Sequence, residues 1–281
     1  MTGRILLRGV LAGGLAGVFA FLFARIFAEP VISRAIDYED ARHKAQDALD
    51  QAAGLPTVPH GQNEVSRGIQ ANLGVGVGLI LFGAAMGALV AVVYTVCLGR
   101  TGKLRPRTLA VLVAAAGFLT LYLVPFLKYP ADPPAIGHED TIRVRSGLYL
   151  LMVAASIAFL ALAVWFGRKL RSRWGSWTAM LVAGGVFLVA VAALMIALPE
   201  FGMLASNVEH FGARATETPF PLTDSTGAIV FPGFPADELY QFRLFSVASQ
   251  LVLWTALALI FAPLVDRLSV SNRPADAALS V

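Results

Sequence analysis

Carboxylates and imidazoles, the side chains best suited to binding divalent metal ions, are grouped in two segments of this sequence. Glu39, His43 and Asp47 follow one another at intervals of four residues, a spacing that places them on one face of a helix. The second group is the consecutive run His138-Glu139-Asp140. Imidazole nitrogen and carboxylate oxygen suit borderline divalent ions such as Co²⁺, Ni²⁺ and Zn²⁺. The alternative interpretation is a solvated helix face and a polar loop.

Motifs of the common enzyme classes are absent from the sequence. It has no glycine-rich phosphate loop, no dinucleotide fingerprint, no Cys-x-x-Cys, no His-Glu-x-x-His and no nucleophile elbow. Cys97 is the only cysteine, so an intramolecular disulfide is excluded. We therefore expect no enzymatic activity, no catalytic residues and no permanently bound cofactor.

Long apolar helices must position the candidate ligands. Apolar residues make up 57% of the sequence and charged residues 14%, against roughly 25% charged in soluble domains. About 20 apolar residues of helix cross a bilayer. We predict an all-α integral membrane protein whose residues 1–281 form a single transmembrane domain. The expected spans are residues 6–27, 72–98, 108–127, 147–167, 177–198 and 244–264.

The first predicted span also resembles a signal peptide, because Arg4 and Arg8 precede its apolar stretch. Bulky Phe23, Ile26 and Phe27 stand where a cleavage site requires small residues. We therefore expect this segment to be retained as a helix.

The charges of the connections predict the orientation. The short connections 100–107 and 168–174 each hold four Lys or Arg and no acid. The other connections, 28–70, 128–146 and 199–243, are longer and of mixed charge. Because short basic loops stay in the cytoplasm, we expect both termini inside and the three longer loops outside. Topology alone explains the basic residues, so we expect no nucleic-acid partner.

Prolines and arginines recur at the outer helix ends. A proline follows each odd-numbered span and is predicted to end it, freeing carbonyl groups: Pro30, Pro130 and Pro199. An arginine precedes each even-numbered span and is expected to reach into water: Arg67, Arg145 and Arg243. The pattern predicts three hairpins stacked in parallel. We assign structural or gating roles to these six residues and to Lys128 and Asp132, which we expect to pair.

Small residues and loop composition predict further local structure. Gly9, Gly13 and Gly17 repeat every four residues in the first span, as do the pairs Gly74/Gly78 and Gly83/Gly87 in the second. Such faces let membrane helices approach closely, so we expect the first two spans to pack together; the alternative is a face toward a partner subunit. Between the spans, 36–53 is predicted to be an amphipathic helix, and 206–241 to be loop-like with a short strand near its Ala-Ile-Val-Phe run.

The apolar cores of the spans contain no Asp, Glu, Lys or Arg: residues 9–24, 71–99, 108–127, 147–167, 175–199 and 244–265. Proteins that move ions usually keep ionisable groups within the membrane, and a bare divalent cation crossing such helices would be very costly. We therefore expect a partner subunit, or a homo-oligomer, to supply further ligands within the lipid bilayer.

Several segments at the helix–loop junctions are distinctive: 8–30 with 34–36 and 39–41, Ser66–Gln70, Phe126–Ala135, and Phe234–Asp237 with Gln241–Arg243. Together they resemble the CbtA family, the probable cobalt transporter subunit. The most specific is Lys128-Tyr129-Pro130-Ala131-Asp132-Pro133-Pro134. In one departure from related chains, the first outer loop holds only two histidines, His43 and His60.

This resemblance implies a multi-pass subunit of a cobalt uptake system in the bacterial cytoplasmic membrane. The transported Co²⁺ would serve cobalamin synthesis, and the partner would be a small single-span subunit bearing histidines. Candidate first contacts for the ion are Glu29, Glu39, His43 and His138. The alternative is a non-transporting envelope scaffold or sensor whose outer loops bind a protein or lipid.

Overall fold

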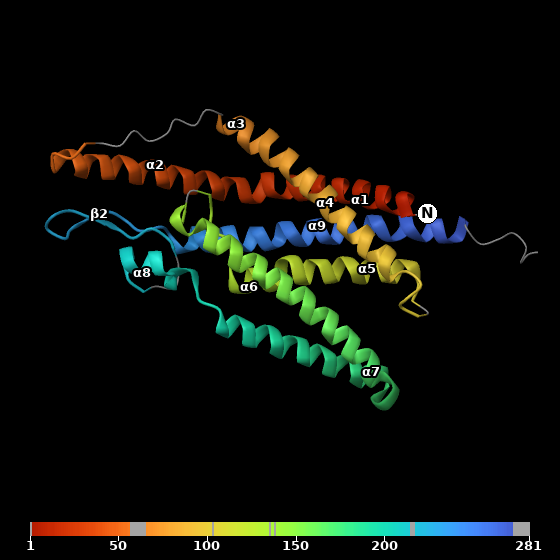
Figure 1. Ribbon diagram of the computed structural model, residues 1–281. Helices are drawn as coiled ribbons and strands as arrows, with labels where there is room; N and C mark the ends of the chain where they lie inside the picture. Colours follow the sequence, from red (N-terminus) through yellow and green to blue (C-terminus); the bar gives the residue numbers. More distant parts are fainter. Residues whose placement is uncertain are drawn as a thin grey trace, which may run out of the picture. The chain divides into compact units, whose positions relative to one another are not determined.

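Helices make up most of the chain (Figure 1). The structure, a computed structural model, describes residues 2–56, 66–102, 104–134, 136–137, 139–213 and 217–271. Among them, five helices are long and apolar enough to cross a membrane: Thr2–Ala52, Arg67–Cys97, Pro106–Lys128, Ile142–Met203 and Ala236–Leu268. This confirms the predicted all-α membrane class. The fourth of these segments contains two of the six predicted spans.

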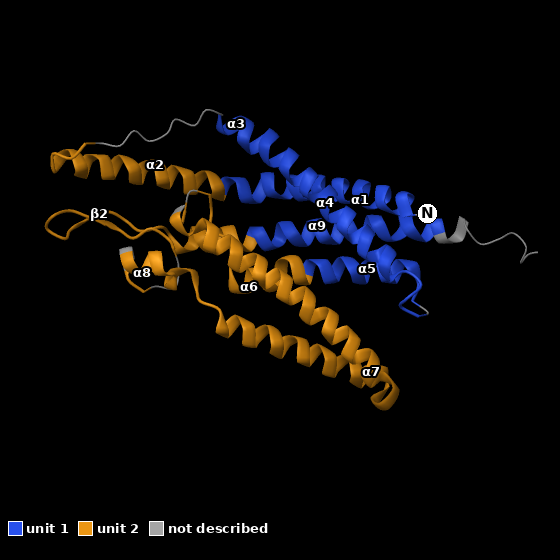
Figure 2. Cartoon of the chain, in the orientation of Figure 1, with its two compact units in different colours: residues 1–30, 62–118, 245–281 blue, residues 31–61, 119–244 orange. Residues whose placement is uncertain are grey.

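The chain separates into two compact units (Figure 2). Unit 1 comprises residues 1–30, 62–118 and 245–281, and unit 2 comprises residues 31–61 and 119–244. Unit 1 contains α1 (Thr2–Phe23), η1 (Ala24–Ala28), α3 (Arg67–Ile69), η2 (Gln70–Gly74), α4 (Val75–Cys97), α5 (Pro106–Gly117) and most of α9 (Ala236–Ser271).

Unit 2 holds the remaining elements. They are α2 (Glu29–Ala52) from its third residue, η3 (Phe118–Leu123) from its second, α6 (Val124–Lys128), η4 (Glu139–Thr141), α7 (Ile142–Ala197), η5 (Phe201–Met203), α8 (Ala205–Phe211), β1 (Leu222–Thr223) and β2 (Ile229–Phe231).

Close backbone contact between α1 and α4 organises unit 1. A Cβ atom added at Gly13 would overlap the carbonyl of Gly83, and one added at Gly87 would overlap the carbonyl of Gly9. The predicted packing of the first two spans is therefore confirmed at these glycines. It does not extend to Gly78, because no atom lies within 4 Å of a Cβ built there.

The prediction that the first helix ends at Pro30 is wrong. The chain passes from α1 through the π-helical turn η1 into α2, which continues to Ala52. Proline lacks an amide donor and clashes with the carbonyl four residues earlier. The wider turn accommodates it, with the amide of Glu29 donating to the carbonyl of Ala24. η3 likewise directly precedes α6, which contains Pro125 near its start. The helix predicted at 36–53 is confirmed as part of α2.

The other two prolines follow helix ends, as predicted. α6 ends at Lys128, two residues before Pro130, and α7 ends at Ala197, two residues before Pro199. The hydroxyl of Tyr129 donates to the carbonyl of Pro199 at 2.9 Å. This hydrogen bond connects the segments that follow α6 and α7.

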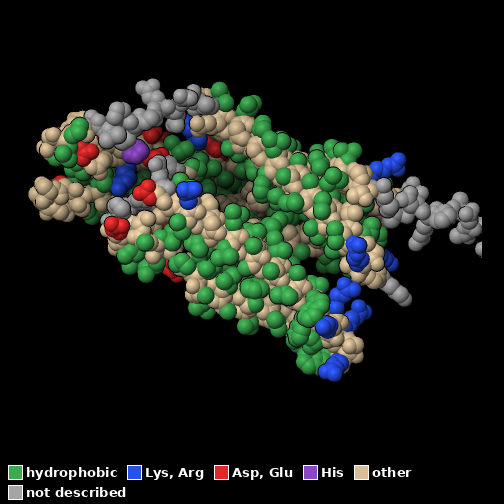
Figure 3. All heavy atoms as spheres, viewed as in Figure 1, with side chains coloured by type: hydrophobic (Ala, Val, Ile, Leu, Met, Phe, Trp, Pro, Cys, Tyr) green, Lys and Arg blue, Asp and Glu red, His purple; other side chains and the backbone are tan. Residues whose placement is uncertain are grey.

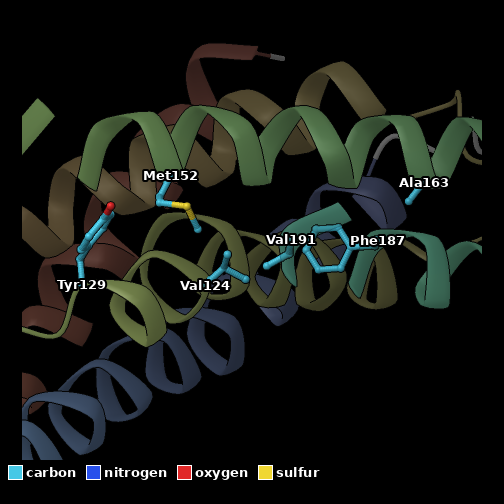
Figure 4. Packing of buried hydrophobic residues seen from close by; sticks show 6 residues of the cluster. All are labelled: Val124, Tyr129, Met152, Ala163, Phe187 and Val191. Atoms are coloured by element: carbon cyan, nitrogen blue, oxygen red, sulfur yellow. The ribbon is translucent and has the colours of Figure 1, made fainter. Parts of the chain in front are cut away.

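α7 is two helices joined at Gly175, whose φ of +74° breaks the helical geometry. The positive φ suits glycine because a Cβ is disfavoured there. The halves pack together: a Cβ added at Gly167 would lie 3.0 Å from the Cβ of Ala183. The buried core of unit 2 joins these halves to α6 (Figure 4). It contains Val124, Tyr129, Met152, Ala163, Phe187 and Val191.

The surface of α7 fits a lipid environment. Large apolar side chains are exposed along both halves, including Leu162 at 60%, Leu188 at 65% and Ile196 at 86%. Lys and Arg gather where the two halves of α7 meet, next to hydrophobic surface (Figure 3). Because apolar exposure on this scale is costly in water, it supports the membrane class.

The segment predicted to be loop-like at 206–241 holds more structure than expected. α8 covers its start, α9 begins at Ala236, and β1 pairs with β2 in a small antiparallel hairpin. The strand predicted near Ala-Ile-Val-Phe is confirmed as β2. Asp224 closes the hairpin by accepting hydrogen bonds from the Thr226 hydroxyl and the Ala228 amide, and these lower the pKa of its carboxyl.

Candidate functional site

An open cavity of about 520 Å³ lies in unit 2, where α2 meets the segment after α6. One wall is formed by consecutive turns of α2: Tyr38, Glu39, Arg42 and His43. The facing wall includes Asp132, Ile136, Gly137, Ile142, Arg145 and Pro219. The cavity therefore gathers ionisable groups from segments far apart in the sequence.

Two of the predicted metal contacts, Glu39 and His43, line this cavity together. They lie one helical turn apart on α2 and so share a face. Asp47, one turn further on, is not among the described lining residues. The cavity thus brings together one carboxylate and one imidazole that the sequence singled out.

The other two predicted contacts are placed differently. Glu29 belongs to unit 1, where its Oε1 accepts a hydrogen bond from Nη2 of Arg67 at 2.9 Å. Its side chain is only 10% exposed. Arg67 also donates to Gln70 at 3.1 Å. His138 lies outside the described residues. Within the described part of the chain, no three His, Cys, Asp or Glu side chains are arranged to hold a metal ion.

A largely buried ionic cluster borders the cavity. Oδ1 of Asp132 accepts a hydrogen bond from Nη2 of Arg243 at 2.7 Å, and its Oδ2 lies 3.8 Å from Nη1 of Arg145. The same Nη1 lies 2.9 Å from Oε2 of Glu217. Oε1 of Glu217 accepts from the Asn207 amide at 2.6 Å. Two acids and two arginines therefore neutralise one another.

Burial sets the electrostatics of this cluster. The side chains of Asp132 and Glu217 are 5% and 0% exposed. Burial raises the pKa of the Asp132 carboxyl above its ordinary value, and the hydrogen bond and charges of Arg243 and Arg145 oppose that rise. Buried ions are tolerated only when paired and hydrogen-bonded, which explains why four charged groups occupy one place.

The expected Lys128–Asp132 pair is not formed. Asp132 pairs with the two arginines, while the Lys128 ammonium lies 5.8 Å from the ring centroid of Tyr129. Tyr129 in turn stacks on Phe201, with ring centroids 4.5 Å apart. Three of the residues assigned structural or gating roles, Asp132, Arg145 and Arg243, are thus brought together, whereas Arg67 lies in unit 1.

Sequence reasoning missed Arg42, Asn207 and Glu217. Arg42 is one of many charged residues in a polar helix, so its type alone did not single it out. Its spacing of four residues from Tyr38 and from Gln46 could have indicated a shared helix face. Glu217 and Asn207 lie in a segment predicted to be a loop, where no helical periodicity marks an inward side chain. Only the folded chain shows that both are buried.

Several exposed apolar helices on one chain define a multi-pass membrane protein. The model of a family described as the probable cobalt transporter subunit (CbtA) matches residues 2–266, nearly the whole chain. The chain belongs to this family of transporter subunits.

Two further comparisons bear on the assignment. A segment of 124 residues is 32% identical to monocarboxylate transporter 13 of Rattus norvegicus. That segment is 43% of this chain but only 28% of that protein, so the likeness supports membrane transport in general. No solved structure matches the chain.

Proposed function

We propose that this chain is the membrane subunit of a cobalt, or divalent metal, uptake system that supplies cobalamin synthesis. The observation that carries the proposal is the family match over residues 2–266. The placement of Glu39 and His43 on one cavity wall supports it, because carboxylate and imidazole suit Co²⁺.

In this proposal the cavity of unit 2 receives the ion. Glu39 and His43 are the first contacts, and Glu29 and His138 act at other points of the path. Two protein donors leave most coordination positions of a divalent ion to water or to other molecules. The site is therefore suited to transient capture rather than permanent binding.

The proposed topology has six crossings in a single transmembrane domain of the bacterial cytoplasmic membrane. The break of α7 at Gly175 supports six rather than five, because it divides one long apolar helix into two. The basic turn at this break, with Arg168, Lys169, Arg171 and Arg173, is expected in the cytoplasm with both termini.

The proposed system needs a second component. The apolar cores of the spans hold no Asp, Glu, Lys or Arg, so a small single-span subunit bearing histidines would supply the ligands that these helices lack. The description of the family as a transporter subunit supports a multi-component system. A second copy of this chain is the alternative source.

Accumulation of radioactive cobalt tests this proposal. Cells that express the chain and its small partner are compared with cells lacking either one. We expect uptake to require both. The double variant Glu39→Gln/His43→Gln should lower uptake, whereas Asp37→Asn, an exposed carboxylate change on the same helix, should not. Uptake that is unchanged after deletion of the chain would exclude transport and favour the scaffold or sensor.

A further inference from the structure

Two guanidinium groups that line the unit 2 cavity each have a nitrogen whose N–H donates no hydrogen bond within the described residues. Nη1 of Arg42 and Nε of Arg145 are enclosed and have no hydrogen-bond partner among the described residues. Both arginines line the same cavity. An enclosed donor without an acceptor is unfavourable, so these nitrogens favour a ligand that brings oxygen acceptors.

The other charges around the cavity do not remove this preference. Asp132 is engaged by Arg243 and Arg145, and Glu217 is engaged by Arg145 and Asn207. The Tyr38 hydroxyl is committed to the carbonyl of Pro232 at 2.9 Å. The oxygens of Asp132 and Tyr38 are thus paired with other groups, while Glu39 lines the cavity one turn of α2 before Arg42.

A bare cation fits this site poorly. Besides Asp132, which is paired with two arginines, the described lining holds one carboxylate and one imidazole, Glu39 and His43. The guanidinium group of Arg42 beside them repels a free cation. The cavity volume of about 520 Å³ also exceeds the roughly 180 Å³ of six water molecules around an ion. It falls in the range of about 300–1,000 Å³ that is typical of sites for small organic ligands.

We infer that the cavity takes a divalent cation already chelated by a small soluble carboxylate. The cation would lie at Glu39 and His43, and a free carboxylate arm would accept hydrogen bonds from Arg42 and Arg145, as arginine favours carboxylates. A rotation of the Arg42 guanidinium group brings its enclosed nitrogen to the ligand, whereas Arg145 keeps its contact with Glu217. This inference rests on the proposed metal-uptake function and names the form in which the metal arrives.

Binding to the purified full chain in phosphatidylcholine nanodiscs tests the inference. The probes are Co²⁺ alone, citrate alone and an equimolar cobalt–citrate mixture. Titration calorimetry measures the affinity of the chain for each of them. We expect the mixture to bind at least about tenfold more tightly than either component, as one charge-assisted hydrogen bond provides. Arg42→Gln should remove this advantage, and Arg42→Lys should keep only part of it.

The matched control is Lys44→Gln. It removes the same charge from the same helix, but Lys44 is exposed and is not among the described residues lining the cavity, so the advantage of the mixture should persist. Circular dichroism spectra that match the wild type show that each variant is folded.

Two results would overturn the inference. The first is equal affinity for Co²⁺ and for cobalt–citrate, or an Arg42→Gln variant that behaves as wild type. The second is loss of the citrate effect when anionic phosphatidylglycerol is included, which would assign the two arginines to lipid phosphate. Either result leaves cobalt accumulation by cells, and hence the proposed function, intact, whereas a failure of that function would appear in the cell assay.

Discussion

Asp132 and Arg243 are 111 residues apart in the sequence, yet Nη2 of Arg243 donates to Oδ1 of Asp132 at 2.7 Å. The carboxylate is only 5% exposed. Removing one partner of a buried pair leaves the other charge uncompensated, which costs about 3–5 kcal/mol. Arg145 would still lie 3.8 Å from Oδ2 of Asp132 and compensate part of this charge, so we expect a smaller loss from Arg243→Gln, a decrease of about 1–3 kcal/mol in the free energy of unfolding, measured by chemical denaturation in mild detergent.

An exposed ion pair in the same unit provides the control for this measurement. Nε of Arg34 lies 2.6 Å from Oε1 of Glu238, and these side chains are 46% and 23% exposed. Solvent screening limits such pairs to about 0–1 kcal/mol. If Arg34→Gln costs as much as Arg243→Gln, burial is not the source of the stability assigned to the cluster.

The raised pKa of Asp132 predicts how stability changes with pH. The ordinary pKa of an Asp carboxyl is 3.8, and the pKa of Asp132 in the folded protein is higher. At pH values between the two, the carboxyl is protonated in a larger fraction of folded than of unfolded molecules. Stability therefore falls as the pH rises through that interval. Relative to wild type, Asp132→Asn should lack this fall, whatever its overall stability.

Denaturation at several pH values from mildly acidic upward separates these effects. The readout is the slope of the free energy of unfolding against pH, compared between wild type and Asp132→Asn. Loss of the ion pairs lowers the whole Asp132→Asn curve but does not by itself change its slope. Parallel curves across the interval would mean that Asp132 titrates at its ordinary value.

Adjacent glycines on α1 give a direct test of the packing in unit 1. A Cβ at Gly13 would overlap the carbonyl of Gly83, whereas nothing lies within 4 Å of one at Gly14. Because overpacking costs about 1–3 kcal/mol, Gly13→Ala should destabilise the protein. Gly14→Ala should be neutral or stabilising, because alanine favours helix by about 0.5–1 kcal/mol. Thermal unfolding in detergent compares the two, and equal effects would contradict this close contact.

Local composition was sufficient to predict the helices but not the path through Pro30. The described helices contain the predicted spans to within one residue at each end, because long uncharged runs leave few alternatives in a bilayer. Pro30 was expected to stop a helix, since proline disrupts the regular pattern. The sequence rule does not anticipate a π-helical turn, which restores a path for the chain by spacing the clashing groups apart.

The residues of the ionic cluster could be predicted in part from the sequence, but their pairing could not. Asp132, Arg145 and Arg243 were each singled out by their position at a helix–loop junction. Their pairing was missed because nearness in sequence favoured Lys128 for Asp132. Glu217 completes the cluster from a segment without periodicity, and only the tertiary fold brings these four residues together.

Gly137 offers a test of how the backbone positions Arg145. Its φ is +141°, and a Cβ added there would lie 3.0 Å from Nη1 of Arg145, the atom that contacts Glu217. Gly137→Ala should therefore strain the backbone and displace this guanidinium group. We expect it to destabilise the protein and to weaken binding of cobalt–citrate.

Gly227→Ala is the matched control, because φ of Gly227 is +84° and nothing lies within 4 Å of the added Cβ. That variant bears only the backbone strain of about 1–2 kcal/mol, and its binding should be unchanged. Equal losses of binding in the two variants would show that Gly137 acts through the backbone alone and does not position Arg145.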